Sequence, residues 1–350
     1  MKILVYDGPR QLRVDEAPSL PVGDGQIKFR TICSGISHGT EMSVYRGVAP
    51  FFSRKQDPDM RLFVPAKSNE VWTYPVRSCD PGVWYMGYAA VGEVIEVGSN
   101  VKDIEVGDIV AASAPHQSES VIDASAAVKL PKDMDPNRGI FLTNLITTLN
   151  GVMDTHIVLG EVVVVSGLGV LGQLVCQLAR MNGARKVYGV DMIELRRQTA
   201  LKNACDEVFD PAACDVAVEI RKRTNNRGAD KVIEVSGNSH ALNEAIRIAA
   251  PETTVTVISW YQGELKGVNL SEEFHHNRIG IKQSQSNHMD PQFSGLWDYA
   301  RRVDTAVDLL GKLELNDLIT QKVQYKDVPE IYQVIDKDPS KVIQAEIVYD

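Results

Sequence analysis

Three glycines at a regular spacing are the clearest chemical feature of this 350-residue chain. They form G-L-G-V-L-G between the apolar run EVVVVS and a segment with helical periodicity. In such a motif the first glycine permits a tight turn, and the second lets the backbone approach a pyrophosphate. The third lets the helix pack closely on the strand, with its N–H groups facing the phosphates. We therefore predict dinucleotide binding by Gly167, Leu168, Gly169, Val170, Leu171 and Gly172.

An acidic residue stands where such a site requires one. Asp191 ends the next apolar strand, 19 positions after Gly172. A carboxylate there accepts both hydroxyls of the adenine ribose and repels a 2′-phosphate, which favours NAD over NADP. Asp191 as a simple turn cap is the alternative. Arg196 is also a cofactor-binding candidate, because an arginine nearby can bind a 2′-phosphate, although it fits equally as a solvated residue at a helix start.

A bound nicotinamide dinucleotide transfers a hydride, and such a reaction commonly also needs a group that moves a proton, for which several side chains of the amino-terminal part are candidates. His38 and His116 are candidates because histidine has an ordinary pKa near neutrality. Tyr88 can donate to or accept from a substrate oxygen. Glu41 can act as a base or orient one of the histidines. For each of them the alternative is a hydrogen-bonded structural residue.

The elements that must position these groups show two different hydrophobic patterns along the chain. Up to about residue 130 the chain consists of short period-two segments separated by turn residues, which indicates an antiparallel, β-rich unit. From about residue 140 strand and helix patterns alternate, which predicts an α/β unit with a doubly wound parallel sheet. A long helix is expected from about Trp297 to Leu313, followed by terminal strands.

A long irregular insertion between Gly47 and Gly87 is rich in aromatic residues. Structureless segments of this length are usually functional lids or binding loops. Its aromatic side chains can line a pocket, which makes Trp84 a candidate for substrate binding, or they can simply pin the segment to the surface. Both interpretations stay open.

Composition narrows the class of protein. With 44% hydrophobic and 24% charged residues the chain is expected to be globular, and its net charge of -9 argues against nucleic-acid binding. Five scattered cysteines suit reduced thiols. No secretion signal or membrane span is recognisable, so we expect a cytoplasmic protein.

Several motifs resemble the medium-chain dehydrogenase/reductase superfamily, over nearly the whole chain. They are the Ser34–Gly47 segment (SGISHGTE…YRG), the Gly87–Val101 segment (GYAAVGEVIEVGSNV), the Val106–Asp108 turn, residues 148–152 (TLNGV) and the glycine motif. The chain looks closest to the branch of bacteriochlorophyllide dehydrogenase-like and alcohol dehydrogenase-like proteins. The resemblance implies a discontinuous GroES-like catalytic domain, residues 1–135 and 290–350. It also implies a Rossmann-like domain, residues 136–289, with the active site between the two.

The chain departs from the zinc enzymes of this superfamily. Their catalytic zinc needs a thiolate, an imidazole and a third cysteine or carboxylate. By resemblance these positions fall on Ser37 or His38, on Tyr88 and on Asn144. We therefore expect no metal, with a site rebuilt from His38, Glu41 and His116 as the alternative.

The resemblance also assigns further positions. Thr40 is placed like the hydroxyl that starts the proton relay of zinc alcohol dehydrogenases, which adds it to the catalytic candidates. Asn144 becomes a candidate for substrate binding. Near the nicotinamide or its ribose the resemblance places Thr148, Ser236, Ser284 and Gln285.

The leading hypothesis is an NAD-dependent oxidoreductase that acts on a secondary alcohol of a polar small molecule, such as a polyol, a sugar-like or a cyclic compound. A zinc-free enone or quinone reductase that uses NAD(P)H is the alternative within enzymes. A non-catalytic NAD-binding protein is the alternative outside them. We expect a homodimer or homotetramer, in which the segment TTVTVIS is an edge strand that can pair across a two-fold axis.

Overall fold

The computed structural model describes residues 1–349, and the chain divides into two compact units. The first unit comprises Met1–Phe141 and Gln321–Asp350, and the second comprises Leu142–Thr320. The first unit is therefore discontinuous. The chain passes from one unit to the other after Phe141 and again after Thr320. The limits of 135 and 290 for the GroES-like and Rossmann-like domains stay predictions.

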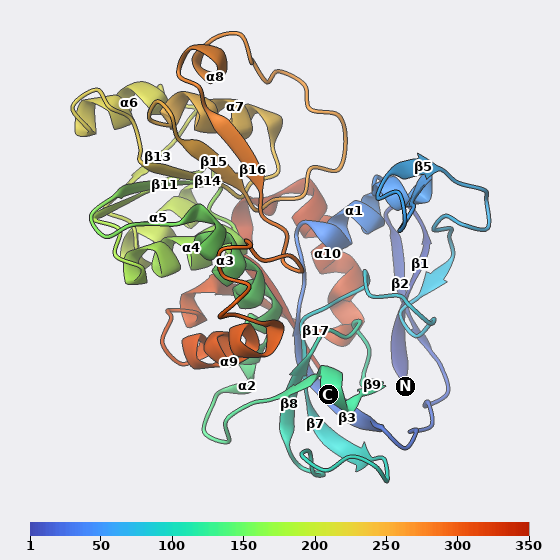
Figure 1. The fold of residues 1–350 in the computed structure, drawn as a ribbon. Coiled ribbons are helices and arrows are strands. Elements are labelled where there is room, and N and C mark those ends of the chain that lie inside the picture. The colour runs from blue at the N-terminus through green and yellow to red at the C-terminus, as the bar shows by residue number, and fades with distance from the viewer. Residues whose placement is uncertain (350) are drawn as a thin grey trace. The chain divides into compact units, whose positions relative to one another are not determined.

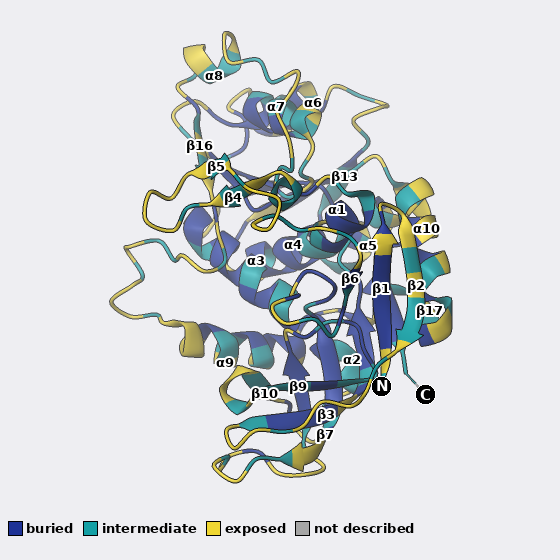
Figure 2. Cartoon of the chain, turned by 90° about the vertical axis from the view of Figure 1, so that its right-hand side faces the viewer, coloured by how far each residue is buried: buried dark blue, intermediate teal, exposed yellow. Residues whose placement is uncertain are grey.

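Antiparallel strands dominate the first unit, as the period-two patterning predicts. The strands are β1 (Lys2–Gly8), β2 (Gln11–Glu16), β3 (Gln26–Gly35), β6 (Val76–Arg77), β7 (Ala90–Val97), β8 (Ile109–Ala112), β9 (Glu119–Asp123), β10 (Ala127–Lys129), β17 (Ile319–Gln324) and β18 (Gln344–Val348). One sheet has the order β2-β1-β6, and a larger one has the order β10-β8-β7-β3-β18-β17, with β9 also paired to β3. β1 is buried along most of its length, whereas β2 at its side is mostly half-buried or exposed (Figure 2).

The helices of the first unit are α1 (Thr40–Arg46), α2 (Pro136–Gly139) and α10 (Val328–Lys337). Tyr45 of α1 and Tyr332 of α10 pack against each other with ring centroids 5.4 Å apart. Tyr6 of β1 completes the cluster, 6.3 Å from Tyr332. All three rings are almost completely buried. This cluster ties α1 to the core, and it therefore fixes the helix that carries Glu41.

The insertion between Gly47 and Gly87 contains a short hairpin of β4 (Arg54–Gln56) and β5 (Phe63–Pro65). Its aromatic side chains pack on one another. Trp72 stacks on Tyr85 with centroids 3.8 Å apart, and Phe52 stacks on Tyr74 at 4.9 Å. Such stacking favours the interpretation in which the aromatic residues pin the segment to the protein.

The second unit contains a six-stranded sheet of parallel strands, as the strand–helix alternation predicts. The strands are β11 (Val162–Ser166), β12 (Lys186–Val190), β13 (Glu207–Phe209), β14 (Lys231–Glu234), β15 (Thr254–Val257) and β16 (Gly280–Gln283). Their order is β13-β12-β11-β14-β15-β16, so the direction of winding reverses between β11 and β14. Ligands of such folds bind beyond the carboxyl ends of the strands at this point.

One expectation about this sheet is wrong. The segment TTVTVIS, which contains β15, is not an edge strand, because β15 pairs with β14 on one side and β16 on the other. The edge on this side is formed by β16, since the chain returns once more to the sheet before it leaves the unit.

Helices cover both faces of the sheet. They are α3 (Leu142–Thr155), α4 (Val170–Met181), α5 (Glu194–Asn203), α6 (Val216–Arg223), α7 (Ser239–Ile248), the short α8 (Glu273–His276) and α9 (Tyr299–Leu310). In Figure 1, α6 and α7 lie on one face, and α3, α4 and α5 lie on the other. The long helix expected from Trp297 is α9, and it packs against α3. This packing is why the second unit extends to Thr320. Within residues 1–349, no helix combines the length and the apolar character that crossing a membrane requires.

Candidate active site

The glycine turn connects β11 to α4 at the point where the sheet reverses its winding. Gly167 has a φ of +97°, a conformation that favours glycine. A Cβ on Gly172 would lie 1.9 Å from the Gly167 carbonyl oxygen, so only glycine lets α4 begin this close to the turn. A Cβ on Gly169 would meet no atom nearer than Nη1 of Arg196, at 4.0 Å. The space beside Gly169, at the first N–H groups of α4, therefore suits a pyrophosphate.

Asp191 follows β12 and receives a backbone N–H on each carboxylate oxygen. Leu168 donates to Oδ2 at 2.8 Å, and Ile193 donates to Oδ1 at 2.8 Å. Asp191 thus does cap the local backbone, but each oxygen keeps a lone pair that can accept a ribose hydroxyl. Nη1 of Arg196 lies 3.8 Å from Asp191 Oδ2. The structure therefore brings Asp191 and Arg196 together beside the glycine turn.

The four residues expected near the nicotinamide differ in accessibility. Ser236 and Gln285 are exposed, and Ser236 adjoins the glycine turn, because a Cβ on Gly167 would lie 2.8 Å from it. Ser284 is buried and donates to Asp154 Oδ2 at 2.6 Å. Thr148 is completely buried, and its hydroxyl donates to the Asn144 carbonyl at 2.9 Å within α3. A direct contact between the Thr148 hydroxyl and a cofactor is therefore disfavoured, because the whole residue is buried.

In the first unit, the Glu41 side chain is completely buried and collects three hydrogen bonds. His116 Nε2 lies 2.8 Å from Glu41 Oε2, and the Tyr332 hydroxyl donates to the same oxygen at 2.6 Å. The Ser37 N–H donates to Oε1 at 2.9 Å. His116 is also completely buried, and its Nδ1 lies 2.8 Å from Ser34 Oγ. Both histidine nitrogens are therefore engaged inside the protein.

This network has one consistent direction of donation. Ser34 Oγ lies 2.9 Å from the Tyr349 hydroxyl, so Tyr349 can donate to Ser34, Ser34 to His116, and His116 to Glu41. Burial raises the pKa of Tyr349, which keeps this phenol a donor. As a base in direct contact with a substrate, buried His116 is disfavoured. Its position suits a residue that acts through Glu41.

Four polar residues near this network are partly exposed, namely Ser37, His38, Thr40 and Tyr88. Tyr88 donates to Ser37 Oγ at 2.6 Å and also interacts with the Thr40 hydroxyl. Burial raises the pKa of Tyr88 to about 12, so the phenol keeps its proton at neutral pH and acts as a donor. Gly87, next to Tyr88, lets the chain pass close to His116, since a Cβ on Gly87 would lie 2.8 Å from the backbone N of His116.

A catalytic zinc ion does not fit the side chains at the positions that the resemblance assigns to its ligands. Ser37 and Tyr88 are hydroxyls joined to each other, and the raised pKa of Tyr88 opposes the deprotonation that binding a metal requires. The alternative set of His38, Glu41 and His116 has His116 bonded at both nitrogens. Within residues 1–349, no group of three or more His, Cys, Asp or Glu side chains is arranged to hold a metal ion.

The two substrate-binding candidates lie in different units. Trp84 is 49% exposed and packs edge-on against Trp72 and Tyr85 of the insertion. Asn144 lies in the first turn of α3 and is partly exposed.

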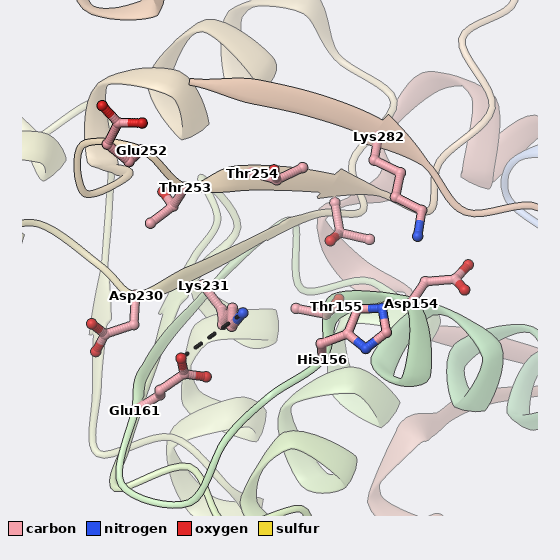
Figure 3. Close-up of a pocket in the computed structure, with 11 residues that line it drawn as sticks. Asp154, Thr155, His156, Glu161, Asp230, Lys231, Glu252, Thr253, Thr254 and Lys282 are labelled. Carbon is pink, nitrogen blue, oxygen red and sulfur yellow. Dashed lines mark ion pairs between the residues drawn. The ribbon is translucent and has the colours of Figure 1, made fainter. Parts of the chain in front are cut away.

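A separate polar pocket lies at the amino-terminal ends of the parallel strands, away from the glycine turn (Figure 3). Glu161 immediately precedes β11, and Lys231 and Thr254 begin β14 and β15, so the pocket adjoins the amino ends of the strands. Both of its lysines are paired, Lys231 with Glu161 of the pocket at 3.9 Å and Lys282 with Asp290 beside it. The glycine turn follows the carboxyl end of β11, so this pocket is not the dinucleotide site.

Sequence reasoning missed several residues that the structure joins to these sites. In the first unit they are Ser34, Tyr332 and Tyr349. In the second unit the missed residue is Glu234, a completely buried carboxylate at the end of β14. One signal was present: an acid that ends the apolar run KVIE of a parallel strand must find donors inside the protein.

Comparison with known proteins places these features in context. A family model described as zinc-binding dehydrogenase matches residues 170–302. That range contains none of the three positions assigned above to zinc ligands. D-guloside 3-dehydrogenase of Escherichia coli (strain K12) is 31% identical over 356 aligned positions, covering 100% of both chains.

Solved structures share the fold at lower identity. Galactitol-1-phosphate dehydrogenase from Escherichia coli superposes with a TM-score of 0.79 and 18% identity, over 99% of this chain and 100% of that one. 2R,3R-butanediol dehydrogenase from Bacillus subtilis gives 0.77 and 20%, over 100% and 99%. These likenesses confirm the expected pair of GroES-like and Rossmann-like domains.

Proposed function

Because this chain belongs to the medium-chain dehydrogenase/reductase superfamily, we propose that it catalyses the reversible, NAD-dependent oxidation of a secondary alcohol without a zinc ion. The observation that carries the proposal is the glycine turn, with Asp191 and open space beside Gly169 at the start of α4. We propose a polyol or sugar-like substrate. The 31% identity to a D-guloside 3-dehydrogenase and the hydroxyl-rich surface around Ser37 support this substrate class.

The second unit would hold the cofactor through the N–H groups at the start of α4 and through Asp191. When bound, NAD supplies the hydride acceptor. The residues of the chain must then orient the alcohol and remove its proton.

We assign proton removal to the first unit. Thr40 holds the substrate oxygen by a hydrogen bond, and Tyr88 does so once its hydrogen turns from Ser37 to the bound substrate. His38 accepts the proton, because it is the partly exposed histidine of the unit. Glu41 fixes Ser37 through its N–H, and Ser37 in turn receives the Tyr88 hydroxyl. Glu41 and His116 therefore act as positioning residues behind the reacting groups.

The test incubates the purified protein with NAD and a panel of polyols, sugars and glycosides while the absorbance of NADH is followed. We expect turnover of at least one of these alcohols. A parallel assay offers NADPH with enones and quinones. Turnover there, with none among the alcohols, would overturn the proposal.

Metal analysis of the same sample tests the zinc-free part separately. We expect far less than one zinc per chain and no loss of turnover after treatment with a chelator. A stoichiometric zinc ion whose removal abolishes turnover would contradict this part and leave the assignment of the reaction intact.

A further inference from the structure

Glu234 gathers four hydrogen-bond donors at the carboxyl end of β14. The Ser236 N–H donates to Oε1 at 2.7 Å, and the Ser236 hydroxyl donates to the same oxygen. On the other oxygen, the Ser259 hydroxyl and the Tyr261 hydroxyl donate to Oε2, the latter at 2.5 Å. Four donors occupy the whole acceptor capacity of a carboxylate. In the described part of the chain, no lysine or arginine pairs with Glu234.

The donors come from two neighbouring strand ends. Ser236 follows β14, whereas Ser259 and Tyr261 follow β15. β14 is one of the two strands between which the winding of the sheet reverses. Ser236 also closes on the glycine turn, because a Cβ on Gly167 would lie 2.8 Å from its backbone N. The cluster of Glu234, Ser236, Ser259 and Tyr261, which we call the Glu234 cluster, therefore borders the predicted cofactor site.

The carboxylate dictates which way each hydroxyl points its hydrogen. A hydroxyl has one hydrogen to donate, and an ionised carboxylate has none. Ser236, Ser259 and Tyr261 all spend that hydrogen on Glu234, so only lone pairs remain for any other partner. Burial and the adjacent carboxylate also raise the pKa of Tyr261, which keeps its hydroxyl protonated. Ser236 accepts one of its remaining bonds from the Asn238 N–H at 3.1 Å.

We propose that Glu234 is a positioning residue that turns the Glu234 cluster into a surface of hydrogen-bond acceptors for the nicotinamide riboside half of the cofactor. The groups that such a surface recognises are donors, namely the carboxamide NH₂ and the ribose hydroxyls. Phosphate groups, which only accept from the protein, are directed instead to the N–H groups at the start of α4. The inference rests on the proposed dinucleotide binding. It adds that the protein offers acceptors, rather than donors, to the nicotinamide riboside half of the cofactor.

The test compares two ligands on the wild type and on Glu234→Gln. NADH carries the nicotinamide riboside, whereas ADP lacks it but contacts the glycine turn and Asp191. A glutamine must keep its oxygen towards the Ser236 N–H, so its NH₂ donates to the Ser259 and Tyr261 hydroxyls and reverses their hydrogens. We expect the Kd of NADH, measured by fluorescence titration, to rise about tenfold in the variant. The Kd of ADP, measured by calorimetry, should change less than about twofold.

Each other outcome has a separate meaning. Equal weakening of NADH and ADP, or no weakening of either, would overturn the inference. If the wild type binds neither ligand, the proposed function itself fails. Should Glu234→Gln not fold, Tyr261→Phe serves the same purpose, because it removes one acceptor and leaves the carboxylate in place. Tyr261→Phe should weaken NADH about threefold and spare ADP, and an unchanged Kd for NADH would count against the proposal.

A ligand analogue separates the two donor sources. Acetylpyridine adenine dinucleotide replaces the carboxamide NH₂ by a methyl group and keeps the ribose. If the cluster receives the amide, Glu234→Gln should weaken the reduced analogue less than it weakens NADH. If the cluster receives the ribose hydroxyls, both ligands should weaken equally. A stronger effect on the analogue than on NADH would contradict both forms of the proposal.

Discussion

Two of the buried carboxylates, Glu41 in the first unit and Glu234 in the second, each collect several hydrogen-bond donors. Glu41 collects His116, Tyr332 and the Ser37 N–H, and Glu234 collects the three hydroxyls of its cluster. Each would cost several kcal/mol to bury without donors. At the scale of residues, a carboxylate that must be buried can be recognised in the sequence more easily than the donors that bind it. The partners of Glu41 lie up to 291 positions away along the chain.

The candidate residues show the same limit. The glycine motif and Asp191 could be predicted because their spacing is local and mechanical. The burial of His116 could not be predicted, because the two partners of its imidazole, Ser34 of β3 and Glu41 of α1, lie 82 and 75 positions away along the chain. Nothing in the sequence near residue 116 indicates that both ring nitrogens are consumed.

His116→Ala and His38→Ala form a contrasting pair. Removing His116 leaves Glu41 buried without its imidazole donor, so the free energy of unfolding should fall by about 2–3 kcal/mol. His38 is only half-buried, so its removal should cost less than about 1 kcal/mol but lower kcat at least a hundredfold. Urea titration and steady-state kinetics measure both quantities. If His116→Ala stays folded but loses kcat, while His38→Ala keeps its full kcat, our assignment of the base would be reversed.

Tyr88 should act as a donor throughout the neutral range. Its pKa is raised to about 12, so it loses its proton only as the pH rises towards that value. Tyr88→Phe should therefore lower kcat about tenfold or more while leaving any inflection near neutral pH where it is in the wild type. The profile of kcat against pH for both proteins provides the measurement. Disappearance of that inflection in Tyr88→Phe would show that Tyr88 titrates near neutrality.

Asp191→Asn keeps the shape of the side chain and removes its charge. The amide oxygen can still accept one of the two N–H groups of Leu168 and Ile193, while the amide NH₂ cannot accept the other, so the turn should survive with one hydrogen bond fewer. We expect NAD affinity to fall about tenfold and NADP affinity to hold or improve, because repulsion of the 2′-phosphate is gone and Arg196 lies near. Calorimetric titration with both dinucleotides tests this. An equal loss for both would refute the ribose contact.

At the scale of elements, the sequence predicts the strands and helices of the second unit well, because β11 to β16 are short apolar runs separated by amphipathic helices. Strand order is harder to predict. The edge position was assigned to the segment of β15, although the four residues of β16 continue the sheet beyond it. The insertion between Gly47 and Gly87 resisted prediction because stacked aromatic rings, rather than regular hydrogen bonding, hold it together.

Two glycines of the turn test how β11 and α4 fit together. In Gly172→Ala the new methyl group would meet the Gly167 carbonyl at 1.9 Å, so α4 must shift. We expect a loss of at least about 2–3 kcal/mol in unfolding free energy. Gly169→Ala meets no atom within 4.0 Å, so stability should change by less than about 1 kcal/mol. Its methyl group would occupy the space for the pyrophosphate and weaken NADH at least tenfold.

Thermal or urea unfolding and fluorescence titration with NADH separate these two effects. Gly172→Ala should lose stability, whereas Gly169→Ala should keep its stability and lose NADH affinity. Each variant therefore serves as the control for the other. If Gly169→Ala binds NADH as tightly as the wild type, the pyrophosphate does not lie over that residue.

At the scale of the whole molecule, the chain forms two compact units with separate hydrophobic cores. The discontinuity of the first unit came from the resemblance, since no local pattern indicates that residues after Gln321 return to strands begun near residue 26. Pairing of β18 with β3 makes that return, and it explains why the Rossmann-like unit can be treated as an insertion into the other. The boundary at Thr320 depends on where α9 packs, which its own amphipathic pattern does not reveal.

The oligomeric state of the protein also belongs to this scale. It can be tested at β16, the edge strand of the parallel sheet. β16 has one neighbour, β15, and carries Ile281 with 41% of its surface exposed. An unprotected edge strand favours pairing with another strand, and a two-fold axis satisfies both edges at once. We therefore expect a homodimer, or a tetramer built from it, with β16 at the interface. Light scattering after gel filtration should give two or four times the 38.6 kDa of one chain.

The edge itself is tested by Ile281→Lys, a change that keeps the backbone but places a charge where two copies would meet. We expect it to lower the assembly to the next smaller species without a loss in the unfolding temperature of the Rossmann-like unit. The matched control is Leu159→Lys, at a residue 84% exposed before β11 and away from this edge, which should leave the mass unchanged. A monomeric wild type would remove the expectation of an oligomer. A mass that responds to Leu159→Lys but not to Ile281→Lys would place the interface elsewhere.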